Sequence, residues 1–355
     1  MNARESCDSK SLMPRPRITQ KEIASKLGLT QAAVSLALAR HHSIPVVTQD
    51  LVHETARMLG YVPDPYLSGL SAYRKRIRPV HFQATLAWLS NYRDRDGWRQ
   101  TVTFREYHEG AVNRAGELGY KIEEHWLHAE NMSNERAAQI LAARNINGLL
   151  VAPQPAPSQR MEFPFARFSS VTFGYTLAEP QLNLAALHQF RSMRTVFRQL
   201  IDLGYRRPGL ALANDSDLRA DHNWSAAFWS EQRYLSPRHR IPPLLPQSLD
   251  KAAFIKWFLK QRPDVVVAIW PEVYDWLIEA GELIPNTIGL ALLSVPDEGR
   301  KFSGIWETPR LIGAKAVECL IDMIHRGECG VPEVPTCVLI EGTWVPGSTL
   351  RRVSG

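Results

Sequence analysis

A run of small and amide-bearing side chains lies near the N-terminus of the chain. Gln31, Ala32, Ala33 and Ser35 directly follow Thr30, and helical periodicity leaves them on the outer face of a short helix. A glutamine amide can bind adenine through two hydrogen bonds, and alanine methyl groups can contact the methyl groups of thymine. The surface therefore fits a DNA major groove, although a three-helix bundle with a purely structural role would show the same local pattern.

The neighbouring sequence predicts the helices that would position this surface. Residues 19–22, Thr-Gln-Lys-Glu, have the spacing of a capping box, and Gly28 is the stop signal of the helix they begin. Thr30 is expected to cap a second helix over 31–39. A third helix is expected over 46–59, with an inner face made by Leu51, Val52, Thr55, Ala56 and Leu59. Two short helices separated by a glycine turn are typical of a helix-turn-helix.

The excess positive charge of the chain is concentrated around these helices. The 355 residues carry a formal net charge of +6. Residues 1–80 hold 12 Lys and Arg against 6 Asp and Glu, so the remaining residues are neutral overall. The asymmetry indicates a basic head that meets a polyanion, with a solubilising tail as the alternative interpretation.

Other classes of protein find little support in the sequence. No phosphate-binding, dinucleotide-binding, nucleophile-elbow or zinc-protease motif occurs, so neither an enzyme nor a cofactor is expected. The cysteines, Cys7, Cys319, Cys329 and Cys337, lack zinc-site spacing and are expected to be reduced thiols. With no export signal and no run of about 18 apolar residues, we expect a cytoplasmic protein without a membrane partner.

One cluster of carboxylates allows two interpretations. Asp215, Asp217 and Asp221 lie within seven residues of one another and could suggest a metal site. Three acidic residues in a short polar segment are more typical of a solvated loop. No metal ligand is therefore assigned.

Two segments of the head resemble the N-terminal domain of the LacI/GalR family of bacterial repressors. They are TQKEIASKLGLTQAAVSLAL (19–38) and TQDLVHETARMLGYVPDP (48–65). The resemblance runs without a gap from Ile18 to about Leu70. It implies that the helix over 31–39 enters the major groove and that Leu70, in a hinge helix, wedges into the minor groove. The implied DNA-binding residues are Thr19, Gln20, Lys21, Thr30, Gln31, Ala32, Ala33, Ser35, Leu36, Tyr61 and Leu70.

Three positions depart from the family pattern. Leu36 stands where many members carry an arginine that reads guanine, Pro45 replaces the usual serine cap of the third helix, and Asp64 replaces an asparagine near the start of the hinge. The departures leave the expected fold intact and leave the operator sequence undefined.

The rest of the chain alternates short apolar runs with amphipathic stretches, as in βα units around parallel sheets. Strands are expected over 84–89, 121–127, 148–152, 170–173, 209–213, 264–269, 288–293 and 338–340, and helices over 104–118, 133–144, 193–203, 225–234, 252–261 and 312–325. Stretches such as LGYRRPGLAL (203–212) and IPNTIGLALL (284–293) are similar to the core of the same family.

The whole pattern predicts an α-helical helix-turn-helix head and an α/β body of two Rossmann-like subdomains of periplasmic-binding-protein type. The expected organisation is a disordered arm at 1–16, a helix-turn-helix at 17–62, a hinge helix and linker at 63–80, and a core at 81–355. The resemblance implies an N-subdomain of about 81–186 and 308–331 and a C-subdomain of about 187–305 and 334–355. The chain is expected to cross between them near 183–190, 303–309 and 330–335.

The resemblance also places a small-molecule effector in the cleft between the subdomains, at the carboxyl ends of strands. The expected effector-binding residues are Asn91, Tyr107, Phe173, Tyr175, Arg219, Trp224, Trp270, Ser294, Trp306 and Glu307. Most of the family's polar cleft residues are replaced, and Trp88, Trp224, Trp270 and Trp306 lie near strand ends. Aromatic faces suit sugar rings, but these indoles could equally fill the core or the cleft.

The function that the sequence favours is a DNA-binding transcriptional regulator, expected to act as a repressor and to form a homodimer or a tetramer built from dimers. Its expected partners are double-stranded operator DNA and a small molecule, with a carbohydrate as one candidate. A regulator without a small-molecule effector, or one controlled by a protein, stays open. A solute-binding protein would share the body but would need an export signal and no basic head.

Overall fold

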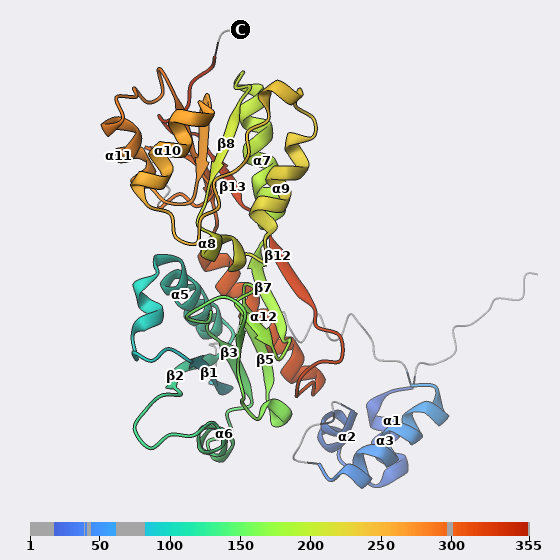
Figure 1. Ribbon diagram of the computed structural model, residues 1–355. Coiled ribbons are helices and arrows are strands. Elements are labelled where there is room, and N and C mark those ends of the chain that lie inside the picture. The colour runs from blue at the N-terminus through green and yellow to red at the C-terminus, as the bar shows by residue number, and fades with distance from the viewer. Residues whose placement is uncertain (1–17, 39, 41–43, 62–81, 297–300, 354–355) are drawn as a thin grey trace, which may run out of the picture. The chain divides into compact units, whose positions relative to one another are not determined.

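The computed structural model describes residues 18–38, 40, 44–61, 82–296 and 301–353. The chain divides near residue 80 into two compact units, which we call the head (18–61) and the body (82–353) (Figure 1). Several predicted features lie outside the described residues: Cys7, the arm at 1–16, Asp64, Leu70 and the rest of the hinge and linker.

The head contains α1 (Gln20–Leu27), α2 (Gln31–Leu38) and α3 (Val46–Leu59). The capping box of α1 is confirmed: the Glu22 amide donates to Thr19 Oγ1 at 3.4 Å, and the Thr19 amide donates to the Glu22 carboxylate at 2.5 Å. Thr30 Oγ1 accepts from the amide of Ala33 at 3.1 Å at the start of α2. Gly28 ends α1 in the left-handed conformation, with φ of 64°, which glycine adopts without steric cost.

The core of the head joins the three helices and corrects one expectation. Ile23, Val34 and Val52 are completely buried in one cluster. Leu51, expected inside, is 49% exposed, while Gln49 is buried and donates to the carbonyl of Ile44 at 2.8 Å. Successive helical residues differ by about 100° around the axis, so Leu51 points outward when Val52 points inward.

The first half of the body is a six-stranded parallel sheet in the order β12-β7-β5-β3-β1-β2. Its elements are β1 (Ala84–Ser90), η1 (Gly97–Gln100), α5 (Val102–Glu117), β2 (Tyr120–Trp126), α6 (Asn134–Ala143), β3 (Gly148–Val151), η2 (Phe165–Arg167), β5 (Ser169–Phe173), β7 (Asn183–Leu187), α12 (Pro309–Arg326) and β12 (Cys337–Ile340). A small parallel pair, β4 (Gln159–Arg160) and β6 (Leu177–Glu179), lies in the connections.

The second half is a five-stranded sheet in the order β13-β11-β10-β9-β8, parallel except for β13. Its elements are α7 (Gln189–Asp202), β8 (Pro208–Ala211), α8 (Asn214–Leu218), α9 (Asn223–Gln232), η3 (Pro237–His239), α10 (Lys251–Gln261), β9 (Val265–Ala268), α11 (Glu272–Glu279), β10 (Gly289–Leu292), β11 (Ser303–Trp306) and β13 (Thr343–Val345). Expected strands and helices occur at the predicted places, but β4, β6, β7, β11, β13, α8 and α11 were not anticipated.

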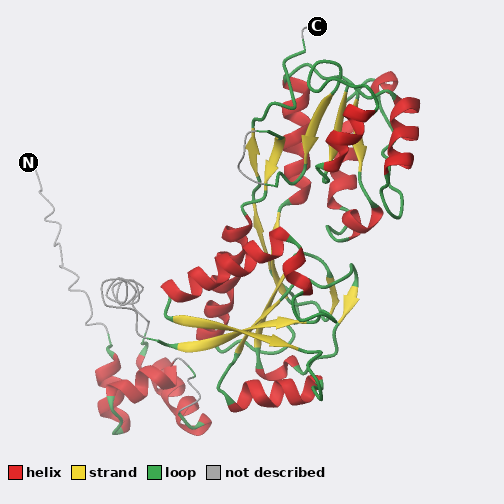
Figure 2. Cartoon of the chain, turned by 90° about the vertical axis from the view of Figure 1, so that its left-hand side faces the viewer, coloured by secondary structure: helices red, strands yellow, loops and turns green. Residues whose placement is uncertain are grey.

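Alternating side chains of each central strand build the layers of the body. Along β1, Leu86 and Trp88 join the cluster that contains α5 and α12, while Ala87 and Leu89 join the cluster that contains α6. Helices accordingly cover both faces of each sheet (Figure 2). The observed fold is therefore a three-helix head with an α/β body of two Rossmann-like halves.

The chain passes between the two halves at three places in the body. The first two, between β7 and α7 and between β11 and α12, fall where they were expected. The third was expected near 330–335 but lies between β12 and β13, at Glu341 and Gly342. The difference arises because β12 pairs with β7 along Cys337–Ile340 and so belongs to the first sheet. Residues 334–340, expected in the C-subdomain, are part of the N-terminal half.

Two helices of the first half pack backbone against backbone. A Cβ atom added at Gly110 of α5 would lie 2.0 Å from the carbonyl oxygen of Arg310, and one at Gly313 of α12 would lie 2.0 Å from that of Tyr107. The absent side chains thus allow α5 and α12 to meet beside the second crossover (Figure 1). Among the described residues, no helix is both long and apolar enough to cross a membrane.

Candidate functional site

The exposed surface of α2 is made by residues on one side of the helix. Gln31, Ala32, Ser35 and Leu36 are all exposed, whereas Val34 and Ala37 on the other side are buried. The helix carries no charged residue. We call these four side chains the α2 face. They offer one amide, one hydroxyl and two apolar groups at helical spacing.

Two capped helix N-termini, those of α1 and of α2 itself, precede this face in the sequence. Thr19 and Lys21 at the start of α1 are exposed, as is Thr30 before α2, and Ala33 is half-buried. The side-chain amide of Gln20 donates a hydrogen bond to the hydroxyl of Tyr61 at 3.1 Å. Two predicted DNA-binding residues that lie 41 positions apart in the sequence are therefore in contact. Helix N-termini present free N–H groups and partial positive charge, which suits phosphate oxygens.

In the body, a cavity of about 170 Å³ lies at the second crossover, and we call it the cleft cavity. It lies between the start of α5 and the residues that follow β9, β10 and β11. Its lining residues are Val102, Thr103, Glu106, Ile269, Pro271, Ser294, Val295, Pro296, Trp306, Glu307 and Pro309. Ser294, Trp306 and Glu307 were predicted from the sequence, and the structure brings these three together.

The surroundings of Glu307 disfavour its charged form. Desolvation raises the pKa of its carboxyl to about 7, a hydrogen bond from the Ser294 side chain opposes the rise, and nearby Glu106 adds to it. Glu106 itself has the Arg310 guanidinium at 3.6 Å. Glu307 lies between β11 and α12, so a ligand that changes its charge acts directly on the crossover.

Other predicted effector residues lie elsewhere in the body. Tyr107 and Phe173 are buried and stack with ring centroids 5.3 Å apart, so burial raises the pKa of the Tyr107 hydroxyl well above its usual value. Trp224 is 3% exposed and, with the fully buried Trp88, belongs to the core. Trp270 is 38% exposed and stands between two cavity-lining residues.

Asn91 and Arg219 lie outside the cleft cavity lining, and both form hydrogen bonds with Gln154. The Asn91 amide donates to Gln154 Oε1 at 3.1 Å, and Arg219 donates to the Gln154 carbonyl at 3.2 Å and to that of Pro155. Arg219 follows α8 in the second half of the body, whereas Gln154 follows β3 in the first. The hydrogen bond between Arg219 and Gln154 therefore joins the two halves of the body. Tyr175 is half-buried, which raises the pKa of its hydroxyl.

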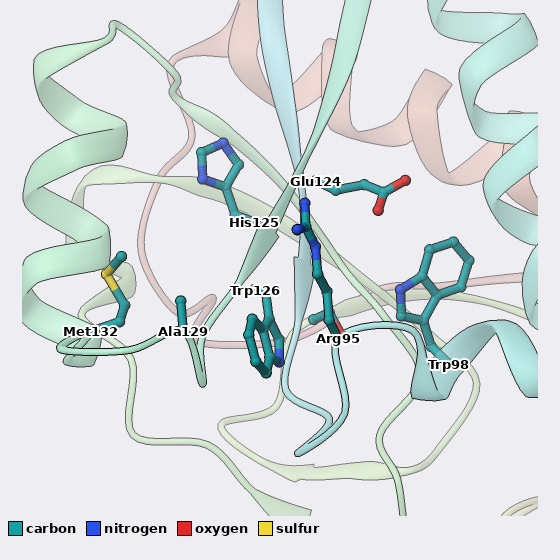
Figure 3. Close-up of a pocket in the computed structure, with 8 residues that line it drawn as sticks. Arg95, Trp98, Glu124, His125, Trp126, Ala129 and Met132 are labelled. Carbon is teal, nitrogen blue, oxygen red and sulfur yellow. The ribbon is translucent and has the colours of Figure 1, made fainter.

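A second cavity, of about 340 Å³, lies at the carboxyl ends of β1 and β2 (Figure 3). Its lining residues are Ser90, Arg95, Trp98, Glu124, His125, Trp126, Ala129 and Met132. None of them was predicted, because they come from three separate segments without a shared motif. The buried Ser90 Oγ has no hydrogen-bond partner among the described residues. The two cavities share no lining residue.

The three carboxylates noted in the sequence differ in burial: Asp221 is exposed and Asp215 half-exposed, as a solvated segment predicts, whereas Asp217 is buried. Asp217 is 1% exposed and accepts hydrogen bonds from the Ser225 amide at 3.0 Å, from Ser225 Oγ at 2.6 Å and from His222 Nδ1 at 2.9 Å. Asp215 pairs with Arg219 at 3.0 Å. Within the described ranges no group of three or more potential metal ligands occurs. Asp217 instead joins α8 to α9.

Replacing Asp217 by alanine should therefore destabilise the body. The change leaves the Ser225 amide and hydroxyl without their acceptor, so we expect a loss of about 3 kcal/mol in the free energy of unfolding, measured by urea denaturation. Asp215→Ala is the matched control, because Asp215 is half-exposed and should cost less than about 1 kcal/mol. Equal losses in the two variants would show that the Asp217 network is not structural.

Comparisons with known proteins agree with this architecture. No protein-family model and no curated protein sequence matches the chain. Among solved structures, the chain resembles a complex of the transcriptional regulator CelR with cellobiose, at a TM-score of 0.52 and 15% identity, over 94% of this chain and 100% of that one. It also resembles the Lac repressor dimer bound to operator and an anti-inducer, at a TM-score of 0.52 and 14% identity, over 95% and 100% of the two chains.

A third similar structure is a LacI family transcriptional regulator from Enterococcus faecium with bound ribose. Its TM-score is 0.53 and its identity 14%, over 76% of this chain and 100% of that one. At these identities the likeness establishes the fold. The chain has the fold of the Lac repressor: a helical head, and a body of two Rossmann-like halves.

Proposed function

We propose that the chain is a sequence-specific DNA-binding transcriptional regulator of the LacI/GalR family. In this proposal it acts as a homodimer, represses transcription, and responds to a small molecule in the cleft cavity. The observation that carries the proposal is the α2 face: an uncharged, exposed helix surface on a helix that Thr30 caps and whose buried side packs against α1 and α3.

The roles of the head residues follow from their positions. Gln31, Ala32 and Leu36, with the half-buried Ala33, would contact base edges. Thr19, Gln20, Lys21, Thr30 and Ser35 would contact phosphates, and Tyr61 would hold Gln20 in place through their hydrogen bond. Leu70 would enter the minor groove as the family resemblance implies.

The positive charge of the residues next to the three helices supports binding of the head to DNA phosphates. The described head carries Lys21, Lys26, Arg40 and Arg57 against Glu22, Asp50 and Glu54, a nearly even balance. Most of the excess positive charge comes from the adjoining sequence, which includes Arg15, Arg17 and the cluster Arg74, Lys75, Arg76 and Arg78. The helices would supply sequence recognition, and the basic segments beside them would supply salt-sensitive affinity.

The cleft cavity supplies a physical route from ligand to DNA. Its lining residues come from both halves of the body, and Glu307 stands in the crossover between β11 and α12. A ligand that binds one arrangement of the halves more tightly shifts the population toward it, and with it the spacing of two heads in a dimer. A regulator that needs no effector is the alternative, and a solute-binding protein would have no use for the α2 face.

The proposal is tested by selecting bound sequences from a library of random DNA duplexes at fixed salt, with the oligomeric state measured by analytical ultracentrifugation. Enrichment of one palindromic motif by a dimer is the expected result. Uniform retention of all sequences that disappears as the salt concentration rises would indicate only electrostatic contact and would overturn the proposal.

A further inference from the structure

The lining of the cleft cavity has charge of one sign. Among the described residues, the eleven that line it include two carboxylates, Glu106 and Glu307, and no lysine, arginine or histidine. The remaining polar side chains are the hydroxyls of Thr103 and Ser294. None of the described lining residues has an amide side chain, although amides and charged pairs are what commonly hold the many hydroxyls of a sugar.

The two carboxylates differ in how their charge is balanced. Arg310 lies 3.6 Å from Glu106 and 3.0 Å from Glu109, so a cation already stands beside the first. Within the described part of the chain, the groups that interact with Glu307 are the side chain of Ser294, the carboxylate of Glu106 and the buried phenol of Tyr107, none of them cationic. Desolvation raises the pKa of Glu307 to about 7, so ionising it without a cation beside it is costly. A ligand with positive charge would remove that cost.

The positive end of a helix dipole is the competing electrostatic effect. The first turn of α5 lines the cavity with Val102 and Thr103 and carries about half an elementary charge. Pro309, at the start of α12, has no N–H to donate. Once ionised, Glu307 carries a full negative charge against about half a positive charge at the helix terminus, and the terminus helps to keep that carboxylate ionised.

Aromatic and apolar surface completes the cavity. Trp306 lines it, Trp270 stands next to it, and Ile269, Val295 and three prolines form much of the remaining wall. A cation over an indole face gains about 0.5–2 kcal/mol, depending on its desolvation. A volume of about 170 Å³ admits a ligand of small size.

We propose that the cleft cavity binds a small organic cation, an amine whose ammonium group contacts Glu307 and lies against the indole of Trp306. The inference rests on the proposed role of this cavity as the effector site, and it names a ligand class other than the sugars bound by the similar regulators. The larger cavity in Figure 3 carries both Arg95 and Glu124, so its lining selects no single charge.

The test is isothermal titration calorimetry of the full-length protein with tyramine and putrescine, with their neutral counterparts 4-ethylphenol and 1,4-butanediol, and with glucose and ribose. We expect at least one amine to bind about tenfold or more tightly than its neutral counterpart. Because the amines stay protonated, their affinity should rise about tenfold from pH 6 to pH 8 as Glu307 ionises. At pH 7 binding should release about half a proton, seen by comparing buffers of different ionisation enthalpy.

Glu307→Gln should abolish both the preference for the amine and its pH dependence. Asp275→Asn is the matched control, because Asp275 is exposed on α11 and does not line the cavity. The pH series on the unchanged protein decides the matter even if Glu307→Gln folds poorly. The inference is overturned if neither amine binds at millimolar concentration, if the neutral counterparts or sugars bind as tightly, or if Glu307→Gln leaves amine affinity intact. Operator selection is measured separately, so its failure would count against the proposed function alone.

Discussion

A glutamate in place of Ser35 should abolish binding to the selected operator, with an expected loss in affinity of at least about 100-fold, or about 2.7 kcal/mol. Ser35 is exposed in the middle of the α2 face. In a major groove a carboxylate there would face phosphates on both sides without a partner, and its desolvation and repulsion would both oppose binding. Glutamate favours helix more than serine does, so α2 itself should persist.

Met58→Glu is the control for this experiment. Met58 is 66% exposed on α3, outside the α2 face, and the substitution changes the net charge of the head by the same amount. Its affinity should stay within about threefold of the parent protein, as measured by fluorescence anisotropy at one salt concentration. Should Ser35→Glu bind the operator as well as Met58→Glu does, α2 would not be the recognition helix.

An alanine at Gly110 should lower the melting temperature of the body by at least about 5 °C. Its Cβ would lie 2.0 Å from the carbonyl oxygen of Arg310 and 2.6 Å from the carbonyl carbon, where ordinary contacts are 3.4–4 Å. Both neighbours are backbone atoms, so α5 and α12 must move apart. Such overpacking costs about 1–3 kcal/mol or more, which exceeds the gain of up to about 1 kcal/mol from replacing a helical glycine. The melting temperature follows from calorimetry.

Gly116→Ala on the same helix is the matched control. An added Cβ there meets nothing within 4 Å, so only the helix-propensity gain remains and the melting temperature should stay constant or rise. The comparison separates the two roles of glycine on α5. Equal melting temperatures for the two variants would contradict the close packing of α5 and α12. Because α5 supplies Glu106 to the cleft cavity, Gly110→Ala should also weaken ligand binding there.

Local features of the head were predictable because they depend on neighbours in the sequence. The capping box of Thr19 and Glu22, the stop at Gly28 and the cap at Thr30 each involve residues three or fewer positions apart, or one residue's own conformation. The exposure of Leu51 was not predicted. Which side of the 14-residue α3 faces the core depends on the helices that pack against it, and these are distant in the sequence.

In the body, short segments with tertiary pairing were the ones that escaped prediction. β7, expected as a crossover, is a strand because it lies between β5 and β12 in the sheet. β12 was expected as a strand, but its apolar residues do not reveal which half it joins, and its pairing with β7 moves the third crossover to Glu341 and Gly342. Parallel pairing joins residues about 150 positions apart, and no local pattern reports it.

The sequence by itself determined the helix-turn-helix head, the α/β alternation of the body and three residues of the cleft cavity, Ser294, Trp306 and Glu307. The head and the α/β alternation follow from periodicity and capping chemistry, which act over short range, and the three cavity residues follow from the resemblance to the LacI/GalR family. Only the tertiary structure decided that Tyr107, Phe173 and Trp224 are core, that Asn91 and Arg219 meet at Gln154, and that Glu106 faces Glu307 across the cavity. Burial and charge at a site are set by segments distant in the chain, which meet only when it folds.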